Sequence, residues 1–253
     1  MARAAVSGRL SWRVAVLAES RQQTPDARTL TFEVPDWPGH LPGQHVDVRL
    51  TAPDGYSVER SYSIASAHDP GAPGRLELSV QRVPDGEVSP YLTGVLRVGD
   101  PVELRGPVGG WFVWRSSDPA PVLLVAGGSG IAPLMAMVRA RAAARSRVPF
   151  RLIYSVRSPQ DTYYAEELRR RARDDAGLDL HMVYTRQAPE SAGEPPGRLT
   201  VATVNTHGWP ADFAPSCFVC GPTGFVETVA DILVALGHDP RRIRTERFGP
   251  TGG

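Results

Sequence analysis

The hydrophobic pattern of this chain changes near residue 120, and that change constrains the fold more than any other feature. Before it, short β-like runs are separated by turn signals such as Pro42-Gly43 and Pro73-Gly74. After it, continuous apolar runs alternate with segments of helical length. The first pattern predicts an antiparallel β-barrel, and the second predicts an α/β domain with a parallel sheet. We therefore expect two domains, 1–115 and 121–253, joined through residues 115–121.

The local patterns also place the individual elements. The strands expected in the first half are Trp12–Glu19, Thr29–Val34, His45–Leu50, Arg60–Ala65, Arg75–Arg82 and Pro101–Arg105. One helix, Ser89–Leu96, is expected among them, with the serine at its start. In the second half we expect strands at Val122–Ala126, Phe150–Val156, Leu180–Thr185 and Cys217–Cys220, and a last one beginning at Ile243. The helices expected there are Pro133–Arg145, Tyr164–Asp174 and Gly224–Leu236, and a looser segment covers Pro189–Gly197.

Composition and charge exclude several classes of protein. The formal net charge is +1, so no global field attracts nucleic acid or an anionic membrane, and we expect neither as a partner. No apolar run is long enough to cross a bilayer, and the start of the chain lacks the pattern of a secretory signal, so we expect a cytoplasmic protein. All 28 basic residues are arginine, which excludes a lysine Schiff base and a lysine-ended phosphate loop.

The cysteines and histidines indicate no metal centre. The only two cysteines, Cys217 and Cys220, lie in an apolar run that is typical of a buried strand. Positions three apart on a strand face opposite sides, which favours two small buried hydrophobes over a redox pair or half a zinc site. Two cysteines are too few for an iron–sulfur cluster. The six histidines show no ligand spacing, so we expect no metal.

A glycine-rich segment, Gly127-Gly-Ser-Gly-Ile-Ala-Pro133, follows the first apolar strand and opens a helix. Its backbone amides suit a pyrophosphate at a helix N-terminus, although Pro133 takes the place of the usual third glycine. The alternative is a tight turn that binds nothing. Thr185 and Arg186 follow the third strand of this half, and Arg157 follows the second. A hydroxyl and guanidinium groups favour the 2′-phosphate of NADPH over NADH; the alternative is solvated surface arginines.

Three further segments suit cofactor chemistry, each with a plainer alternative. Arg60-Ser-Tyr-Ser-Ile-Ala-Ser66 places a cation, a ring and hydroxyls on one extended run, as a flavin requires, but it could be an ordinary strand. Gly86-Glu-Val-Ser89 precedes a helix and could hold phosphate or merely cap it. Cys220-Gly-Pro-Thr-Gly224 is a tight strand-to-helix turn whose thiol could border a nicotinamide or simply fill the core.

These segments, taken in order, resemble the ferredoxin–NADP reductase superfamily from about Leu10 to Phe248. The set is completed by Gly106-Pro-Val-Gly109 and Glu246-Arg-Phe248. The resemblance implies a barrel that binds FAD and an α/β domain that binds NADPH. It also implies hydride transfer to flavin N5, followed by single-electron transfer to an acceptor.

The resemblance also implies roles for particular residues. On the flavin side, Arg60 would contact the pyrophosphate, Tyr62 would lie against the ring and Ser63 would hydrogen-bond near N5. The other FAD-binding residues would be Ser61, Gly86, Val88 and Ser89. The nicotinamide nucleotide would be bound by Gly128, Gly130, Ile131, Pro133, Arg157, Thr185, Arg186, Cys220, Gly221 and Pro222. Ser63, Cys220 and Glu246 would be the catalytic residues, and Phe248 would cover the other flavin face.

The leading hypothesis is an FAD-dependent NADPH oxidoreductase that serves a separate redox partner. No fused iron–sulfur or haem domain is expected, so a ferredoxin, a haem protein or a molybdopterin protein are all open as acceptors. One alternative is a flavin reductase that uses free flavin as a substrate. Another is a flavin- or nucleotide-binding regulatory module without turnover. The segments of the second half favour an enzyme, because a mere flavin binder would not need them.

Overall fold

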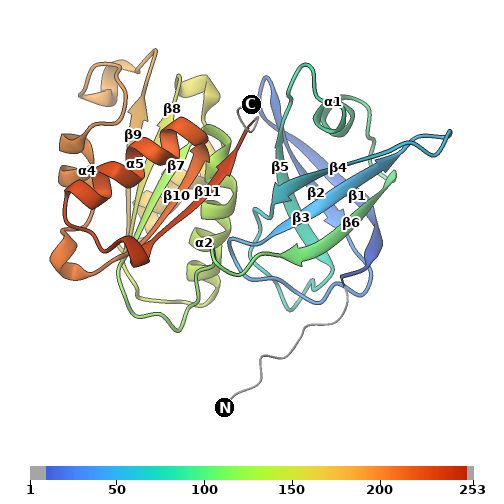
Figure 1. The fold of residues 1–253 in the computed structure, drawn as a ribbon, viewed down its shortest axis with the longest axis horizontal. Coiled ribbons are helices and arrows are strands. Elements are labelled where there is room, and N and C mark those ends of the chain that lie inside the picture. The colour runs from blue at the N-terminus through green and yellow to red at the C-terminus, as the bar shows by residue number, and fades with distance from the viewer. Residues whose placement is uncertain (1–9, 250–253) are drawn as a thin grey trace.

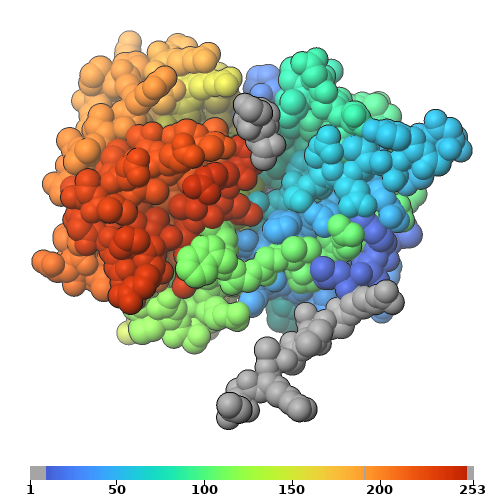
Figure 2. All heavy atoms as spheres, in the orientation of Figure 1, coloured from blue at the N-terminus to red at the C-terminus, as the bar shows by residue number. Residues whose placement is uncertain are grey.

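The computed structural model describes residues 10–249, which form two lobes, each built around its own sheet (Figures 1 and 2). The sheet of the first lobe is antiparallel, in the order β4-β3-β6-β1-β2-β5. Its strands are β1 (Trp12–Thr24), β2 (Ala27–Glu33), β3 (His45–Thr51), β4 (Ser57–Ser63), β5 (Arg75–Gln81) and β6 (Pro101–Val108). A bridge between Ile64 and Leu78 joins the two edges, so the sheet curls into the expected barrel.

The barrel forms because its strands alternate between inward apolar and outward polar residues. In β5, for example, Leu76 and Leu78 are fully buried, whereas Arg75 is exposed. The helix α1 (Val88–Gly94) packs against β4 and β5 and adds Val88 and Leu92 to the same core. Burial of these side chains removes apolar surface from water, which is the main term that stabilises the barrel.

Several boundaries in this lobe differ from the sequence prediction: β1 continues beyond Glu19 to Thr24, and β6 continues beyond Arg105 to Val108. The strand expected at 60–65 begins earlier, at Ser57, and leaves the ladder after Ser63. The helix α1 begins before Ser89, so the serine is not its N-cap. Instead, the Ser89 hydroxyl accepts a hydrogen bond from the Val83 amide at 3.0 Å and fixes the turn that precedes the helix.

The second lobe is a parallel α/β domain with the sheet order β11-β10-β7-β8-β9. Its strands are β7 (Val122–Gly127), β8 (Phe150–Val156), β9 (Leu178–Tyr184), β10 (Ser216–Pro222) and β11 (Ile243–Phe248). Its helices are α2 (Ile131–Ala143), α3 (Ala165–Asp174), α4 (Val201–His207) and α5 (Thr223–Ala235). Short 3-10 turns lie at η1 (Gly128–Gly130), η2 (Pro159–Asp161), η3 (Glu190–Ala192), η4 (Ala211–Phe213) and η5 (Pro240–Arg242).

Helices cover both faces of this sheet, which explains why its strands are continuously apolar. The helices α2 and α3 share one core cluster with the sheet, and α4 and α5 share the other. Cys220 belongs to the first cluster and Cys217 to the second, so the prediction that they face opposite sides is confirmed. Both are free thiols.

The sequence analysis missed the helix α4. Its residues Val201, Thr203 and Val204 are β-branched, and such residues are poor helix formers. The missed signal was Thr200, whose side chain caps the helix by accepting from the Thr203 amide at 3.2 Å.

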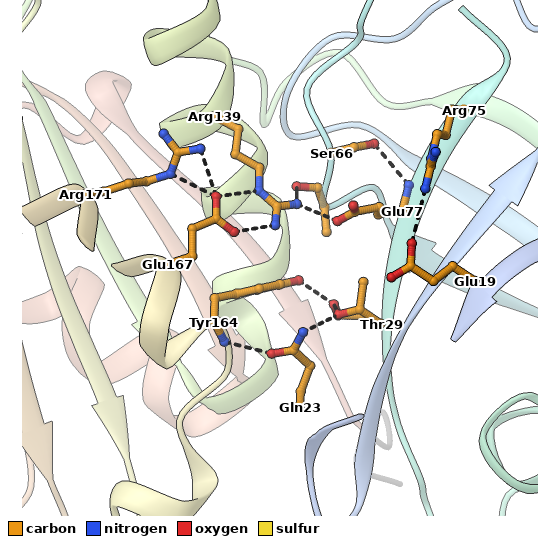
Figure 3. Close-up of polar contacts among 12 residues, drawn as sticks. Glu19, Gln23, Thr29, Ser66, Arg75, Glu77, Arg139, Tyr164, Glu167 and Arg171 are labelled. Atoms are coloured by element: carbon orange, nitrogen blue, oxygen red, sulfur yellow. Dashed lines mark hydrogen bonds and ion pairs between the residues drawn. The ribbon is translucent and has the colours of Figure 1, made fainter. Parts of the chain in front are cut away.

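The two lobes are joined by a polar contact that lies across their interface (Figure 3). Arg139 of α2 donates to the Glu77 carboxylate of β5 at 2.6 Å and to the Ala65 carbonyl at 3.0 Å. The same guanidinium donates to Glu167 of α3 at 2.6 Å, and Arg171 also donates to that carboxylate. These paired carboxylates hold the pKa of Arg139 well above its ordinary value, against the effect of burial, so its charge is permanent.

A second contact lies beside it and centres on Tyr164, the residue before α3. The Tyr164 amide donates to the Gln23 side chain of β1 at 2.9 Å, and its hydroxyl hydrogen-bonds Ser79 of β5. Because polar groups buried between lobes are costly unless paired, these matched bonds favour one relative placement of the two sheets. Among residues 10–249, no helix is long and apolar enough to cross a membrane.

Candidate functional site

A cleft of about 220 Å³ opens where the parallel strands of the second lobe end. Ligands bind at this edge of open α/β sheets, because the loops that follow the strands surround it. The wall from the second lobe consists of Gly127, Gly128, Ser129, Ser155, Val156, Arg157, Asp161, Tyr163, Thr185, Pro222, Phe225 and Phe248. The first lobe contributes Asp26 and Gln81. The structure therefore brings together five of the predicted site residues: Gly128, Arg157, Thr185, Pro222 and Phe248.

The floor of the cleft is the glycine turn η1. Gly128 has φ +54°, a left-handed conformation that favours glycine, and the space where a Cβ would stand is open. A Cβ on Gly130 would overlap the backbone carbonyl of Cys220, so η1 packs directly on β10. The helix α2 that follows has no side-chain cap and no acidic residue in its first turn. The dipole at this end of α2 suits an anion, as expected of this segment.

Arg157 follows the end of β8, and Thr185 and Arg186 follow the end of β9. The Arg186 amide donates to the Arg157 carbonyl at 2.9 Å, so the two residues are neighbours after β8 and β9. Both side chains are exposed, and within residues 10–249 neither forms an ion pair. Thr185 is half-buried and lines the cleft. Two free guanidinium groups beside a hydroxyl form a site that can hold a phosphate by charge-assisted hydrogen bonds.

Some predicted site residues are buried as packing groups. The side chains of Ile131 and Pro133 lie under the first turn of α2, so only their backbone can face a ligand. Cys220 is also buried, and burial, with Glu246 nearby, raises the pKa of its thiol well above the ordinary value. The thiol is therefore neutral and not nucleophilic. Gly221 approaches Gly127 so closely that a Cβ would contact its backbone at 3.2 Å.

The strand β4 presents its predicted flavin-binding residues on two different faces. Tyr62 packs against the barrel core, and Arg60 lies two residues away on the same face with an exposed side chain. Burial raises the pKa of Tyr62 to about 12, so its ring carries a neutral phenol. Ser61 lies on the opposite face, where its hydroxyl donates to Asp47 at 2.7 Å. The structure thus separates the Ser61 side chain from those of Arg60 and Tyr62. Ser63 ends the strand, half-buried, opposite His45 of β3.

The start of α1 lies near this strand. The Tyr56 hydroxyl, which precedes β4, donates to the Glu87 carboxylate at 2.9 Å. That contact holds the Glu87 carboxylate at the start of α1. The Gly86 amide is bonded to the Val83 carbonyl at 3.0 Å, and Val88 and Ser89 are buried. Only the first backbone amides of α1 remain for a phosphate, and no side chain caps the helix.

Glu246 of β11 lies beside Cys220 of β10, because the two residues are partners in the parallel ladder. Burial raises the pKa of Glu246 to about 7. One carboxylate oxygen lies 3.9 Å from Nδ1 of His45, across the interface between the lobes. The other is buried without a hydrogen-bond partner in the described part of the chain. An orphaned, easily protonated oxygen at an interface is typical of a functional site.

Several residues of the cleft were missed by the sequence analysis. Asp26 and Gln81 come from the barrel, and their side chains are hydrogen-bonded to each other at 2.9 Å. The Tyr163 hydroxyl is buried and has no hydrogen-bond partner among residues 10–249. Ser155 was the one detectable signal, since it ends a parallel strand at the edge where ligands bind. The others are brought in by folding over long sequence separations.

The barrel and the cleft fit the two nucleotides that the sequence analysis expected. Arg60, which forms no ion pair among the described residues, and Tyr62 offer a cation and a flat ring on one face, and Gly128 and the uncapped α2 offer a cradle for a pyrophosphate. Comparison with known proteins agrees. Residues 14–113 match the oxidoreductase FAD-binding domain, and residues 124–231 match the oxidoreductase NAD-binding domain.

Relatives with curated descriptions cover most of the chain. It is 33% identical to ferredoxin–NADP reductase B of Sorangium cellulosum over 239 residues, which cover 92% of this chain and 96% of the relative. It is 34% identical to the glycine betaine monooxygenase reductase subunit of Pseudomonas aeruginosa over 236 residues. That match covers 91% of this chain but only 62% of the length of the relative.

Solved structures show the same arrangement. The cytochrome P450 reductase GcoB of Amycolatopsis superposes with a TM-score of 0.83 at 28% identity, over 98% of this chain and 74% of that one. The FAD/NAD-binding domain of nitric oxide dioxygenase from Vibrio cholerae gives 0.83 at 26% identity, over 94% and 99% of the two chains. Fold, site and comparisons together define a two-domain protein that binds FAD and NAD(P). The chain belongs to the ferredoxin–NADP reductase family.

Proposed function

We propose that this protein oxidises NADPH and passes the electrons through FAD to a separate redox protein. The observation that carries the proposal is the cleft at the strand ends, where Gly128, Arg157 and Thr185 meet Phe248 and the barrel residue Asp26. A nucleotide in this cleft lies between the two lobes, next to the half that binds FAD. We assign residues 1–115 to the flavin and 121–253 to the nicotinamide nucleotide.

On the flavin side, the roles follow from the chemistry of each side chain. FAD, when bound, supplies the group that accepts a hydride and gives up electrons singly. Arg60 pairs with its pyrophosphate, because an exposed guanidinium without an ion-pair partner is suited to a bidentate phosphate contact. Tyr62 provides a flat apolar support for the ring, and Ser63 donates a hydrogen bond beside it. The first amides of α1, after Gly86, hold the remaining phosphate charge.

On the nicotinamide side, the backbone of η1 binds the pyrophosphate, and Arg157, Thr185 and Arg186 bind the 2′-phosphate. Cys220, Gly221 and Pro222 shape the wall that orients the nicotinamide, with a neutral thiol that excludes water. Glu246 holds or releases a proton at its unpartnered oxygen, which a pKa of about 7 permits at neutral pH. Phe248 covers the ring until the nucleotide enters. Positioning of this kind is the main contribution of a protein to hydride transfer.

Anaerobic stopped-flow mixing tests the activity. The FAD-loaded protein is mixed with NADPH or with NADH, and the flavin absorbance is followed. We expect rapid bleaching by NADPH and slower bleaching by NADH. Flavin that stays oxidised with both nucleotides would reject the enzyme. Protein that purifies without flavin but reduces added flavin would instead support a flavin reductase.

Nucleotide preference is tested by R186A. We expect the KM for NADPH to rise at least tenfold, because the variant loses a charge-assisted bond that NADH does not make. The KM for NADH and the kcat should change little. Steady-state kinetics with both nucleotides measure this, and R173A, which removes an exposed arginine of α3, is the matched control. Equal effects on the two nucleotides would reject the preference.

For the acceptor, a ferredoxin is the first partner to test. Ferredoxin–NADP reductase B matches nearly the whole chain, whereas the oxygenase reductase subunits extend beyond it. The measurement is NADPH-dependent reduction of purified ferredoxins in the presence of catalytic amounts of this protein. Reduction of small dyes without reduction of any ferredoxin would direct the search to a haem or oxygenase protein.

A further inference from the structure

Two histidines and a glutamate meet in the nucleotide-binding lobe, outside the cleft. His181 lies in β9, which is the edge strand of the sheet, and His207 is the last residue of α4. Glu194 lies in the segment between η3 and α4. Each residue offers one nitrogen or oxygen atom, and these three atoms lie within 4.8 Å of one another. None of the three residues lines the cleft described above.

The histidine pair is held in an unusual way. The two rings are stacked, with centroids 3.4 Å apart and planes 9° from parallel. Nε2 of His181 is buried and has no hydrogen-bond partner within residues 10–249. A buried polar atom without a partner costs free energy, so it calls for an explanation.

Backbone contacts bring Glu194 to this pair. Gly193, just before it, has φ +71°, which turns the chain. The Gly197 amide, just after it, donates to the Tyr184 carbonyl at the end of β9, at 2.9 Å. The carboxylate itself is exposed and makes no hydrogen bond or ion pair with other described residues. The segment therefore returns to the edge strand with the Glu194 carboxylate beside the two imidazole rings.

We propose that His181, Glu194 and His207 form a binding site for one divalent transition-metal ion of the zinc class. Two imidazole nitrogens and one carboxylate oxygen are the donor set that such ions take in proteins, with water completing the shell. The bound ion ties the segment after β9 and the end of α4 to the edge strand. Its role is structural, since the site is separate from the nucleotide cleft.

The stacking of the His181 and His207 rings describes the site without a bound ion. An imidazole binds a metal through a lone pair in its own ring plane, but an ion between two parallel rings lies outside both planes. One ring must therefore rotate when the ion binds. Metal–ligand bonds of ~2.1 Å place the donor atoms about 3.3 Å from one another. The three donor atoms now lie within 4.8 Å of one another, so they must also move slightly closer when the ion binds. Both movements are side-chain rotations and require no change in the fold.

Calorimetric titration tests the proposal. The FAD-loaded full chain is treated with a chelator, dialysed and titrated with zinc chloride. We expect one ion per chain, with affinity reduced at least tenfold in H207A and in H181A, and severalfold in E194Q. Zinc should also raise the Tm of the wild type but not that of H207A, because an ion that binds the folded state stabilises it.

Two control variants match the substitutions. E190Q removes a carboxylate from the same segment, and H68A removes a histidine of the barrel lobe; both should bind zinc as the wild type does. No zinc binding by the wild type would overturn the proposal. So would binding that survives H207A within threefold, because the ion would then sit elsewhere. If H181A loses its FAD or melts early, H207A and E194Q decide the matter, as they remove partly exposed side chains.

Discussion

At the scale of single residues, Glu246 is the most informative group. It combines a raised pKa, an oxygen without a partner and a place beside both Cys220 and His45. Its ionised form is poorly solvated in the folded protein, whereas the unfolded chain ionises freely near its ordinary pKa of 4.5. Below pH 4.5 the group is protonated in both the folded and the unfolded state, and the folded protein has its full stability. As the pH rises toward 7, the unfolded chain releases this proton more readily than the folded protein does, and the free energy of unfolding falls.

This gives a prediction for E246Q. A neutral amide has no proton to lose, so the variant should gain stability relative to the wild type as the pH rises from 5 to 8. The relative gain should be roughly 2 kcal/mol. Urea unfolding at the two pH values measures it. E227Q, at an exposed position of α5, is the control and should show no such trend. A constant difference between E246Q and the wild type would mean that Glu246 ionises normally.

Two adjacent tyrosines make a second matched test. The Tyr164 hydroxyl is hydrogen-bonded to Ser79 across the interface between the lobes, whereas the buried Tyr163 hydroxyl has no partner among residues 10–249. Y164F should cost about 1 kcal/mol, since it leaves Ser79 with one bond fewer. Y163F should cost nothing without nucleotide, because it removes an unpaired polar group. Chemical denaturation measures both, and equal losses would contradict the assignment.

At the scale of elements, the glycine turn η1 depends on its close contact with β10. G130A would place a methyl group against the Cys220 carbonyl. The overlapping atoms belong to the backbone of Cys220 and Gly221, so no side-chain rotation can remove the clash. We expect a loss of about 3 kcal/mol or more, in line with overpacked cores, together with weaker nucleotide binding. Thermal unfolding and nucleotide titration measure the two effects.

G224A is the control for this prediction. It also adds a methyl group near the start of a helix, but open space surrounds the position. It should be neutral or slightly stabilising, because alanine favours the helix. If both variants behave alike, the tight contact between η1 and β10 does not set the stability of the turn.

The elements that the sequence predicted well are those with strong local patterns. Leu76 to Val80 alternate strictly, and Phe150–Val156 is an apolar run bounded by turns, so the strands β5 and β8 were placed closely. The sequence also indicated the ferredoxin–NADP reductase family and the two cofactors, which the comparisons confirm. The helix α4 was missed because its β-branched residues contradict the helix that tertiary packing imposes.

The candidate site was only partly predictable for the same physical reason. Gly128 and Thr185 follow apolar strands, so their place at the sheet edge could be derived locally. Asp26 and Gln81 reach the cleft only because the barrel docks beside it, and no local pattern encodes that docking. His181 and His207 were likewise assigned no metal role from spacing. They meet only after a loop, a helix and an edge strand are folded together.

At the scale of the whole molecule, Arg139 links the lobes. R139A would leave the partly buried Glu77 without its ion-pair partner and Glu167 with Arg171 alone, which should cost about 3 kcal/mol. The unfolding of the lobes should then separate into two steps, because one of the two polar contacts that couple them is gone. Differential scanning calorimetry measures this. R173A removes an exposed pair and should change little. A single unchanged transition in R139A would show that the lobes are coupled by other contacts.

The interface also bears on how such proteins can be recombined (Figure 3). A chimera that joins this barrel to the second half of another family member would place an unknown residue opposite Glu77, Ser79 and Gln23. Exchanging halves at a linker alone therefore produces mismatched partners, however well each half folds. A working chimera must therefore take the interface residues of both lobes from the same protein.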